Sequence, residues 1–126
     1  MTATRILVVE DDPGVRRVLE RGLRMAGHEA TMTEDVAGGR AAWAGGSFDL
    51  VLLDVMLPDG DGIALLTERR AAGDETPTIL LTAREESELH QRAVAAGATD
   101  YLSKPFVYAD LLERVERLAR RVDKPG

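Results

Sequence analysis

The sequence lacks cysteine altogether, which excludes disulfides, thiolate nucleophiles and cysteine-ligated metal sites. It also lacks long apolar runs. None exceeds four residues, whereas a membrane-spanning helix needs about 18. Near the start of the chain Arg5 is soon followed by acidic residues 10–12, so there is no apolar centre for a signal peptide. From these absences we expect a cytoplasmic protein with no membrane partner.

Positive charge is also in short supply. Sixteen basic residues stand against 22 acidic ones, for a formal net charge of −6, and the only lysines are Lys104 and Lys124. Affinity for nucleic acid rests largely on the neutralisation of phosphates. The most basic stretch, residues 114–121, is interrupted by Glu116, which is typical of a solvated helix face. We therefore expect no nucleic-acid contact by this chain itself.

The chain length of 126 residues corresponds to one domain. A chain of this size buries enough surface to form a hydrophobic core without disulfides. We expect the domain to cover residues 1–121, and residues 122–126 to form a tail or the start of a linker.

Short apolar runs alternate with stretches of helical spacing along the chain. The runs predict strands at residues 6–9, 28–33, 50–53, 78–81 and 101–102. Apolar residues at helical spacing predict five helices: from Pro13 to a stop at Gly27, over 36–43, through 65–70, over 85–96 and through 111–122. Strands separated by helices pair in parallel, with helices on both faces of the sheet. The sequence therefore predicts an α/β fold, a doubly wound five-stranded parallel sheet in three layers.

Polar residues follow four of the five predicted strands, the first, third, fourth and fifth, at the point where the apolar run ends. They are Glu10 and Asp11, Asp54, Thr82 and Lys104. Ligands of such sheets bind outside the carboxyl ends of the strands, so we expect these side chains to converge on one edge. Carboxylates that lie close together repel one another and need a cation, and oxygen ligands without histidine or cysteine favour Mg²⁺. A carboxylate can also attack phosphorus. The residues alone thus predict a Mg²⁺-dependent phospho-aspartate site.

Other acidic and histidine residues have simpler interpretations. Asp12 directly precedes Pro13 and is expected to cap a helix N-terminus rather than to bind a metal. Asp59 and Asp61 lie in a glycine-rich turn, where aspartate commonly binds its own backbone, and are left out of the site. His28 and His90 show no ligand spacing and are expected at the surface.

Four motifs together carry a family resemblance. They are Ile-Leu-Val-Val-Glu-Asp-Asp at 6–12, Leu-Leu-Asp-Val-Met-Leu-Pro-Asp-Gly-Asp-Gly at 52–62, Leu-Thr-Ala at 81–83 and Lys-Pro-Phe at 104–106. In this order they resemble the receiver domain of two-component response regulators, and the resemblance covers about residues 5–121. It implies a flavodoxin-like (βα)5 sandwich with strand order 2-1-3-4-5.

The resemblance also implies a role for each site residue. Asp54 would be the phosphoacceptor, taking its phosphoryl group from a sensor histidine kinase or, in some members, from acetyl phosphate. Thr82 and Lys104 would bind the phosphoryl group, with Lys104 oriented by a cis peptide bond to Pro105. Tyr101 would be the aromatic switch. The cofactor would be Mg²⁺ (or Mn²⁺), held by Glu10, Asp11, Asp54 and the backbone carbonyl of Met56.

The Lys-Pro-Phe motif and the helix after it resemble receivers of winged-helix transcription factors. In that subfamily phosphorylation drives a symmetric homodimer through the fourth helix, fifth strand and fifth helix. The candidate dimer residues here are Asp100 with Arg114, and His90 opposite Asp110.

The chain departs from the subfamily pattern at three positions of that face. His90 stands where arginine is usual, Gln91 replaces an apolar contact, and Thr99 replaces the first of two aspartates. Because histidine gains its charge in mildly acidic solution, a His90–Asp110 contact predicts a dimer that is tighter at mildly acidic pH.

Several alternative functions remain open at this point. No DNA-binding domain is expected within these residues, so the chain could be a stand-alone receiver that acts by protein contacts or the receiver half of a longer regulator. We favour the second because the Asp-Lys-Pro-Gly end would suit a linker. The chain could also be an enzyme of another class, a small aspartyl-phosphate phosphatase or phosphotransferase, but it lacks the motif that such enzymes carry after the first strand. A flavin or nucleotide binder lacks a glycine-rich phosphate loop. A receiver that no longer signals by phosphate would not need the complete acidic set.

Overall fold

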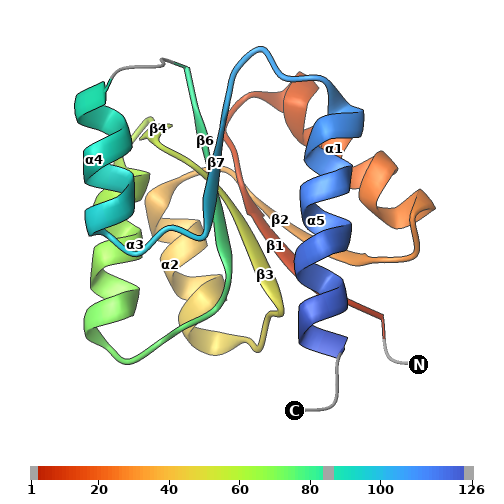
Figure 1. Ribbon diagram of the computed structural model, residues 1–126, viewed down its shortest axis with the longest axis horizontal. Coiled ribbons are helices and arrows are strands. Elements are labelled where there is room, and N and C mark those ends of the chain that lie inside the picture. The colour runs from red at the N-terminus through yellow and green to blue at the C-terminus, as the bar shows by residue number, and fades with distance from the viewer. Residues whose placement is uncertain (1–2, 84–86, 124–126) are drawn as a thin grey trace.

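The computed structural model describes residues 3–83 and 87–123, which form a single parallel sheet between two layers of helices (Figure 1). Its strands are β1 (Arg5–Val9), β2 (Glu29–Thr33), β3 (Leu50–Asp54), β6 (Thr78–Thr82) and β7 (Asp100–Ser103), in the order β2-β1-β3-β6-β7. The strands β4 (Met56–Leu57) and β5 (Gly60–Asp61) form a short antiparallel hairpin outside this sheet, so the last two strands of the sheet are numbered β6 and β7. The observed order is therefore the predicted 2-1-3-4-5, and the fold class is confirmed.

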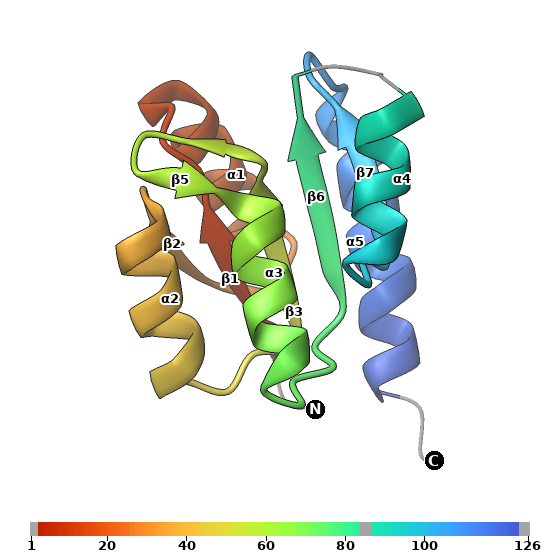
Figure 2. The same ribbon diagram turned by 90° about the vertical axis from the view of Figure 1, so that its left-hand side faces the viewer.

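The five helices divide between the two faces of the sheet. They are α1 (Pro13–Met25), α2 (Val36–Gly45), α3 (Gly62–Ala71), α4 (Ser87–Ala95) and α5 (Tyr108–Asp123). Helices α1 and α5 cover one face, whereas α2, α3 and α4 cover the other (Figures 1 and 2). Strand residues alternate between the two cores: Ile6 and Val8 pack with α1 and α5, and Leu7 and Val9 pack with α2 and α3. A sheet buried on both faces explains why its strands are continuously apolar.

Local signals in the sequence account for most element boundaries. Helix α1 begins where Asp12 caps it and Pro13 opens it, and it ends before Gly27, which has a φ of 93° that favours glycine. Strand β2 begins at Glu29 rather than His28. Helix α5 continues to Asp123, two residues into the segment predicted as a tail. The predicted start of the fourth helix at residues 85–86 lies outside the described residues.

None of the helices in the described part of the chain combines the length and the apolar character that crossing a bilayer requires.

Candidate functional site

The carboxyl ends of the strands bring the predicted polar residues together. Glu10 follows β1 directly, Asp54 and Thr82 end the neighbouring strands β3 and β6, and Lys104 follows β7. The backbone N–H of Lys104 donates to the carbonyl oxygen of Thr82 at 2.6 Å, which ties the last two strand ends to each other. The convergence that the sequence predicted is therefore present in the fold.

Three carboxylates form a compact cluster at this edge. One oxygen each of Glu10, Asp11 and Asp54 lies within 4.8 Å of the others. Glu10 is fully buried and Asp54 is 4 % exposed, whereas Asp11 is open to solvent. Glu10 Oε2 is buried and has no hydrogen-bond partner among the described residues. An all-oxygen donor set with one orphaned buried oxygen and one open side fits a small divalent cation such as Mg²⁺.

Lys104 supplies the positive charge within this cluster. Its Nζ lies 2.5 Å from Glu10 Oε1 and 3.1 Å from Asp54 Oδ2. Burial lowers the pKa of Lys104, but the hydrogen bond to Glu10 and the charge of Asp54 outweigh burial and raise it. The ammonium is therefore held charged between the carboxyl groups of Glu10 and Asp54, which lie at the ends of the neighbouring strands β1 and β3. The Lys104–Pro105 peptide bond is cis, as expected.

Burial has the opposite consequence for Glu10. Removal from water, together with the neighbouring Asp54, raises the pKa of Glu10 to about 8, although Lys104 lowers it in part. A carboxyl group at this position holds a proton near neutral pH unless another cation joins the site.

The position of Asp54 is set by its backbone surroundings. Its Oδ1 accepts a hydrogen bond from the N–H of Met56 at 3.1 Å. Gly62 packs so closely that a Cβ there would lie 2.0 Å from the carbonyl oxygen of Asp54. The next residue, Val55, donates its N–H to Leu81 and accepts from Gly62. The strand end that presents Asp54 is thus clamped by β6 on one side and the start of α3 on the other.

The aspartates left out of the site all cap helices. Asp12 Oδ1 accepts from the N–H groups of Gly14 and Val15, and these bonds lower its pKa. Asp61 caps α3 and also binds Arg92 of α4 at 2.5 Å. Asp59 reaches from the β4–β5 hairpin to the N–H groups that open α2, at residues 36 and 37. The exclusion of these residues from the acidic cluster agrees with the structure.

Thr82 and Tyr101 differ in burial and in their contacts. Thr82 is 3 % exposed at the end of β6. Tyr101 is half-buried in β7, opposite Leu80, and its ring meets that of His90 edge-on with centroids 4.9 Å apart. His90 is exposed, as expected, and it ties the predicted aromatic switch to α4.

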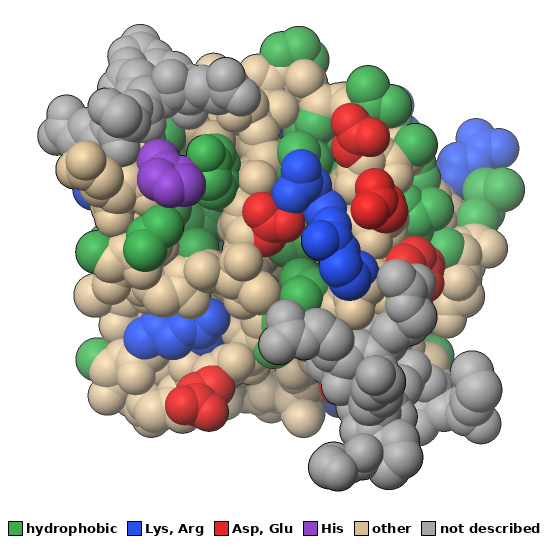
Figure 3. Space-filling model, in the orientation of Figure 1, with side chains coloured by type: hydrophobic (Ala, Val, Ile, Leu, Met, Phe, Trp, Pro, Cys, Tyr) green, Lys and Arg blue, Asp and Glu red, His purple; other side chains and the backbone are tan. Residues whose placement is uncertain are grey.

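The predicted dimer residues lie on the α4, β7 and α5 side of the molecule. Arg114 Nη1 binds Asp100 Oδ2 at 2.6 Å within the same chain. Asp110 is exposed in the first turn of α5. Figure 3 shows basic and acidic side chains interspersed over α5, with hydrophobic side chains and a histidine over α4. This face therefore offers mixed charge beside apolar surface.

One histidine assignment was wrong. The side chain of His28 is only 7 % exposed, and its Nε2 lies 2.8 Å from Glu116 Oε1 of α5. A lone histidine after a helix-ending glycine gives no sign of burial. The burial of His28 depends on α5, which lies far away in the sequence and packs beside it only in the folded domain.

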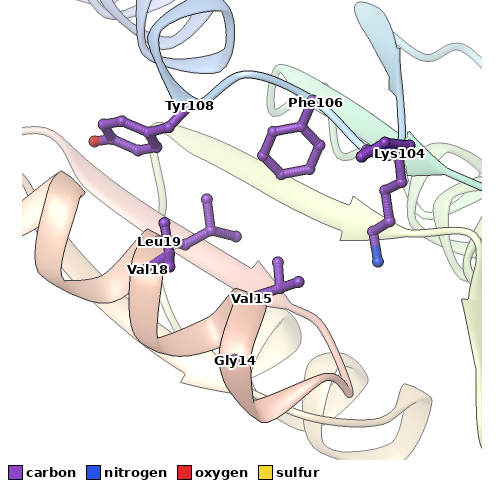
Figure 4. A pocket seen from close by; sticks show the side chains of 8 residues that line it. Gly14, Val15, Val18, Leu19, Lys104, Phe106 and Tyr108 are labelled. Carbon is purple, nitrogen blue, oxygen red and sulfur yellow. The ribbon is translucent and has the colours of Figure 1, made fainter.

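Sequence reasoning also missed two features beside the site. Arg16, one turn into α1, binds the backbone carbonyls of Glu10 and Asp11. A largely apolar groove of about 450 Å³ runs from Lys104 along α1, between Val15, Val18 and Phe106 (Figure 4). In the sequence, only the closeness of Arg16 to Glu10 and Asp11 could have indicated its contact with their carbonyls.

Comparisons with known proteins agree on one family. Residues 6–116 match the response regulator receiver domain family. Swarming motility regulation protein RssB of Serratia marcescens is 42% identical over 117 residues, 93% of this chain and 53% of that protein. Transcriptional regulatory protein PrrA of Mycobacterium tuberculosis is 40% identical over 121 residues, 96% of this chain and 52% of that protein. The chain thus spans about half the length of these curated relatives.

A solved structure shows the same fold. The receiver domain of the Francisella response regulator 1452 superposes with a TM-score of 0.91 at 29% identity, over 95% of this chain and 99% of that one. Sequence and structure thus point the same way.

Proposed function

The chain belongs to the response regulator receiver domain family, and on that premise we propose that it accepts a phosphoryl group on Asp54 from a sensor histidine kinase. Receivers of this family are signalling domains, and such a kinase is their partner. The observation that carries the proposal is the cluster of Glu10, Asp11 and Asp54 around the ammonium of Lys104. We further propose that the domain acts in the cytoplasm.

Each residue of the cluster has a chemical task in this proposal. An oxygen of the Asp54 carboxylate attacks phosphorus, and the bond from phosphorus to the donor atom breaks with its electron pair left on the donor. Glu10, Asp11 and Asp54, with the carbonyl of Met56, would hold Mg²⁺ or Mn²⁺, which neutralises charge on the phosphoryl oxygens. Lys104 exchanges a carboxylate oxygen for a phosphoryl oxygen, and Thr82 donates its hydroxyl to another.

We propose that the phosphorylated site acts on the face formed by α4, β7 and α5. Movement of Thr82 toward the phosphoryl group would let Tyr101 turn inward and leave His90. This face would then form a symmetric homodimer, with Asp100 and Arg114 exchanging their present intrachain bond for one across the interface. The relative PrrA, which is named a transcriptional regulatory protein, supports a receiver half of a longer winged-helix regulator.

The first test is phosphorylation by a small-molecule donor. We expect acetyl phosphate with Mg²⁺ to add one phosphoryl group, seen by intact-mass spectrometry, and expect no adduct with Asp54→Ala or without metal. Asp59→Ala is the matched control, since Asp59 lies outside the cluster, and it should label like the native chain. An adduct on Asp54→Ala would refute the assignment. If the native chain gives none, beryllofluoride binding separates a strict need for the kinase from a receiver that signals without phosphate.

The same samples address the enzyme alternative. Steady turnover of p-nitrophenyl phosphate would favour a phosphatase or phosphotransferase over a receiver. We expect no such turnover beyond the stoichiometric labelling of Asp54.

A further inference from the structure

Arg16 makes two hydrogen bonds to the backbone of the acidic pair. Its Nη1 donates to the carbonyl oxygen of Glu10 at 3.0 Å and to that of Asp11 at 2.7 Å. The side chain is only 23% exposed, and its Nη2 lies 3.5 Å from Glu34 Oε2. One guanidinium group thus binds two consecutive peptide groups of the loop that carries two of the three clustered carboxylates.

The loop is anchored on its other side as well. The N–H of Glu10 donates to the carbonyl oxygen of Thr33 at 3.0 Å, and the N–H of Arg16 donates to that of Asp12 at 2.9 Å. Both carbonyl oxygens of the acidic pair therefore point to Arg16, while their side-chain oxygens gather with Asp54. Loss of the guanidinium would free the two peptide planes that decide where these side chains point.

We propose that Arg16 is a positioning residue for the divalent cation: it holds the carboxylates of Glu10 and Asp11 in the geometry that binds the ion. This inference rests on the proposed function, because it concerns the same cation site. Arg16 itself does not touch the ion. It acts through the backbone of two ligand residues, as outer-shell hydrogen bonds do in other metal sites.

Because Arg16 is positively charged, the direction in which its removal changes the Mg²⁺ affinity tests the inference. A cation near a Mg²⁺ site repels the ion, so the removal of that charge alone would strengthen binding. Loss of positioning weakens binding instead. The two mechanisms thus predict changes in opposite directions for the same substitution.

The experiment compares Mg²⁺ dissociation constants by titration calorimetry at pH 8.5 for the native chain, Arg16→Met, Arg16→Lys and Arg17→Met. The last is the matched control, because Arg17 is exposed on the same turn of α1 and its substitution removes the same charge. We expect Arg16→Met to bind Mg²⁺ about tenfold or more weakly, Arg16→Lys to recover part of the affinity, and Arg17→Met to bind no more weakly than the native chain. Circular dichroism and the Tm report whether each variant is folded.

Each outcome decides a different question. Native-like or tighter binding by folded Arg16→Met overturns the positioning role and leaves the proposed function standing. Equal weakening by Arg16→Met and Arg17→Met also overturns it, because a substitution that leaves the hydrogen bonds to Glu10 and Asp11 intact would then have the same effect. If Arg16→Met does not fold, Arg16→Lys decides by the same comparison. If the native chain itself binds no Mg²⁺, the metal-dependent part of the proposed function fails together with this inference.

Discussion

The ammonium of Lys104 lies 2.5 Å from a carboxylate oxygen of Glu10, a residue 94 positions away in the chain. This contact lets a fully buried carboxyl group and a lysine share one pocket with Asp54. It also means that the acidic cluster carries its own counter-charge before any metal or phosphoryl group arrives. The site has consequences for the pH dependence of cation binding and stability, for packing around Asp54 and for the face formed by α4, β7 and α5.

Mg²⁺ binding should depend on pH through Glu10. Because burial and Asp54 raise the pKa of Glu10 to about 8, the carboxyl group must lose a proton before it serves a cation. We expect Mg²⁺ affinity to rise by up to about tenfold per pH unit below pH 8 and to level off above it. Calorimetry in buffers of different ionisation enthalpy measures the released proton. A dissociation constant that is constant between pH 6 and 8 would contradict this prediction.

The same shift predicts how stability changes with pH in metal-free protein. Glu10 ionises near 4.5 in the unfolded chain but near 8 in the folded one, so between these values the folded form holds a proton that the unfolded form has released. Stability from this group is complete below pH 4.5 and is lost as the pH rises toward 8. We expect the Tm to fall over this range in the native chain and to fall less in Glu10→Gln. Equal slopes would remove Glu10 as the cause.

Gly62 should tolerate no side chain. A Cβ at this position would lie 2.0 Å from the carbonyl oxygen of Asp54, so either the strand end or α3 must move. We expect Gly62→Ala to lower the free energy of unfolding by about 1–3 kcal/mol or more and to slow phosphorylation by acetyl phosphate. Chemical denaturation and intact mass measure the two effects. Gly45→Ala is the control, since a Cβ there meets nothing within 4 Å, and it should lose neither stability nor labelling.

Asp59 should stabilise α2 without affecting the cation site. The N–H groups of Val36 and Ala37 lower the pKa of Asp59, so its contribution is present above the ordinary carboxyl pKa and is lost as the pH falls through the lowered value. We expect Asp59→Ala to lower the Tm at pH 7 and the difference to vanish in strong acid. Its Mg²⁺ affinity should equal that of the native chain, and a large loss of affinity would return Asp59 to the site.

Dimerisation of the phosphorylated domain should be tighter at pH 6 than at pH 8. His90 is exposed on α4 and is expected to face Asp110 of the partner copy, where a protonated ring forms an ion pair. Analytical ultracentrifugation of the beryllofluoride-loaded protein measures the dissociation constant. The pH dependence should disappear in His90→Arg, which stays charged, and in His90→Gln, which is never charged. A flat response of the native chain would refute the role of His90.

The amino-acid sequence alone determined the layout of the domain and the place of its acidic site. Continuous apolar runs such as residues 50–53 mark strands buried on both faces, and the polar residue after each run marks the edge where ligands bind. Local capping signals such as Asp12 before Pro13 likewise act within a few residues. These features depend on neighbours in the chain, so they can be interpreted without a fold.

Only the tertiary structure decided which side chains meet across the domain. His28 binds Glu116 of α5 from 88 positions away, and Asp59 caps a helix that begins 23 positions before it. The two-residue strands β4 and β5 are too short to show alternation and exist through their pairing. Arg16 lies near the acidic pair in sequence, but whether it reaches their carbonyls depends on the angle between β1 and α1. Such contacts depend on how distant elements pack, and hydrophobic periodicity carries no record of that geometry.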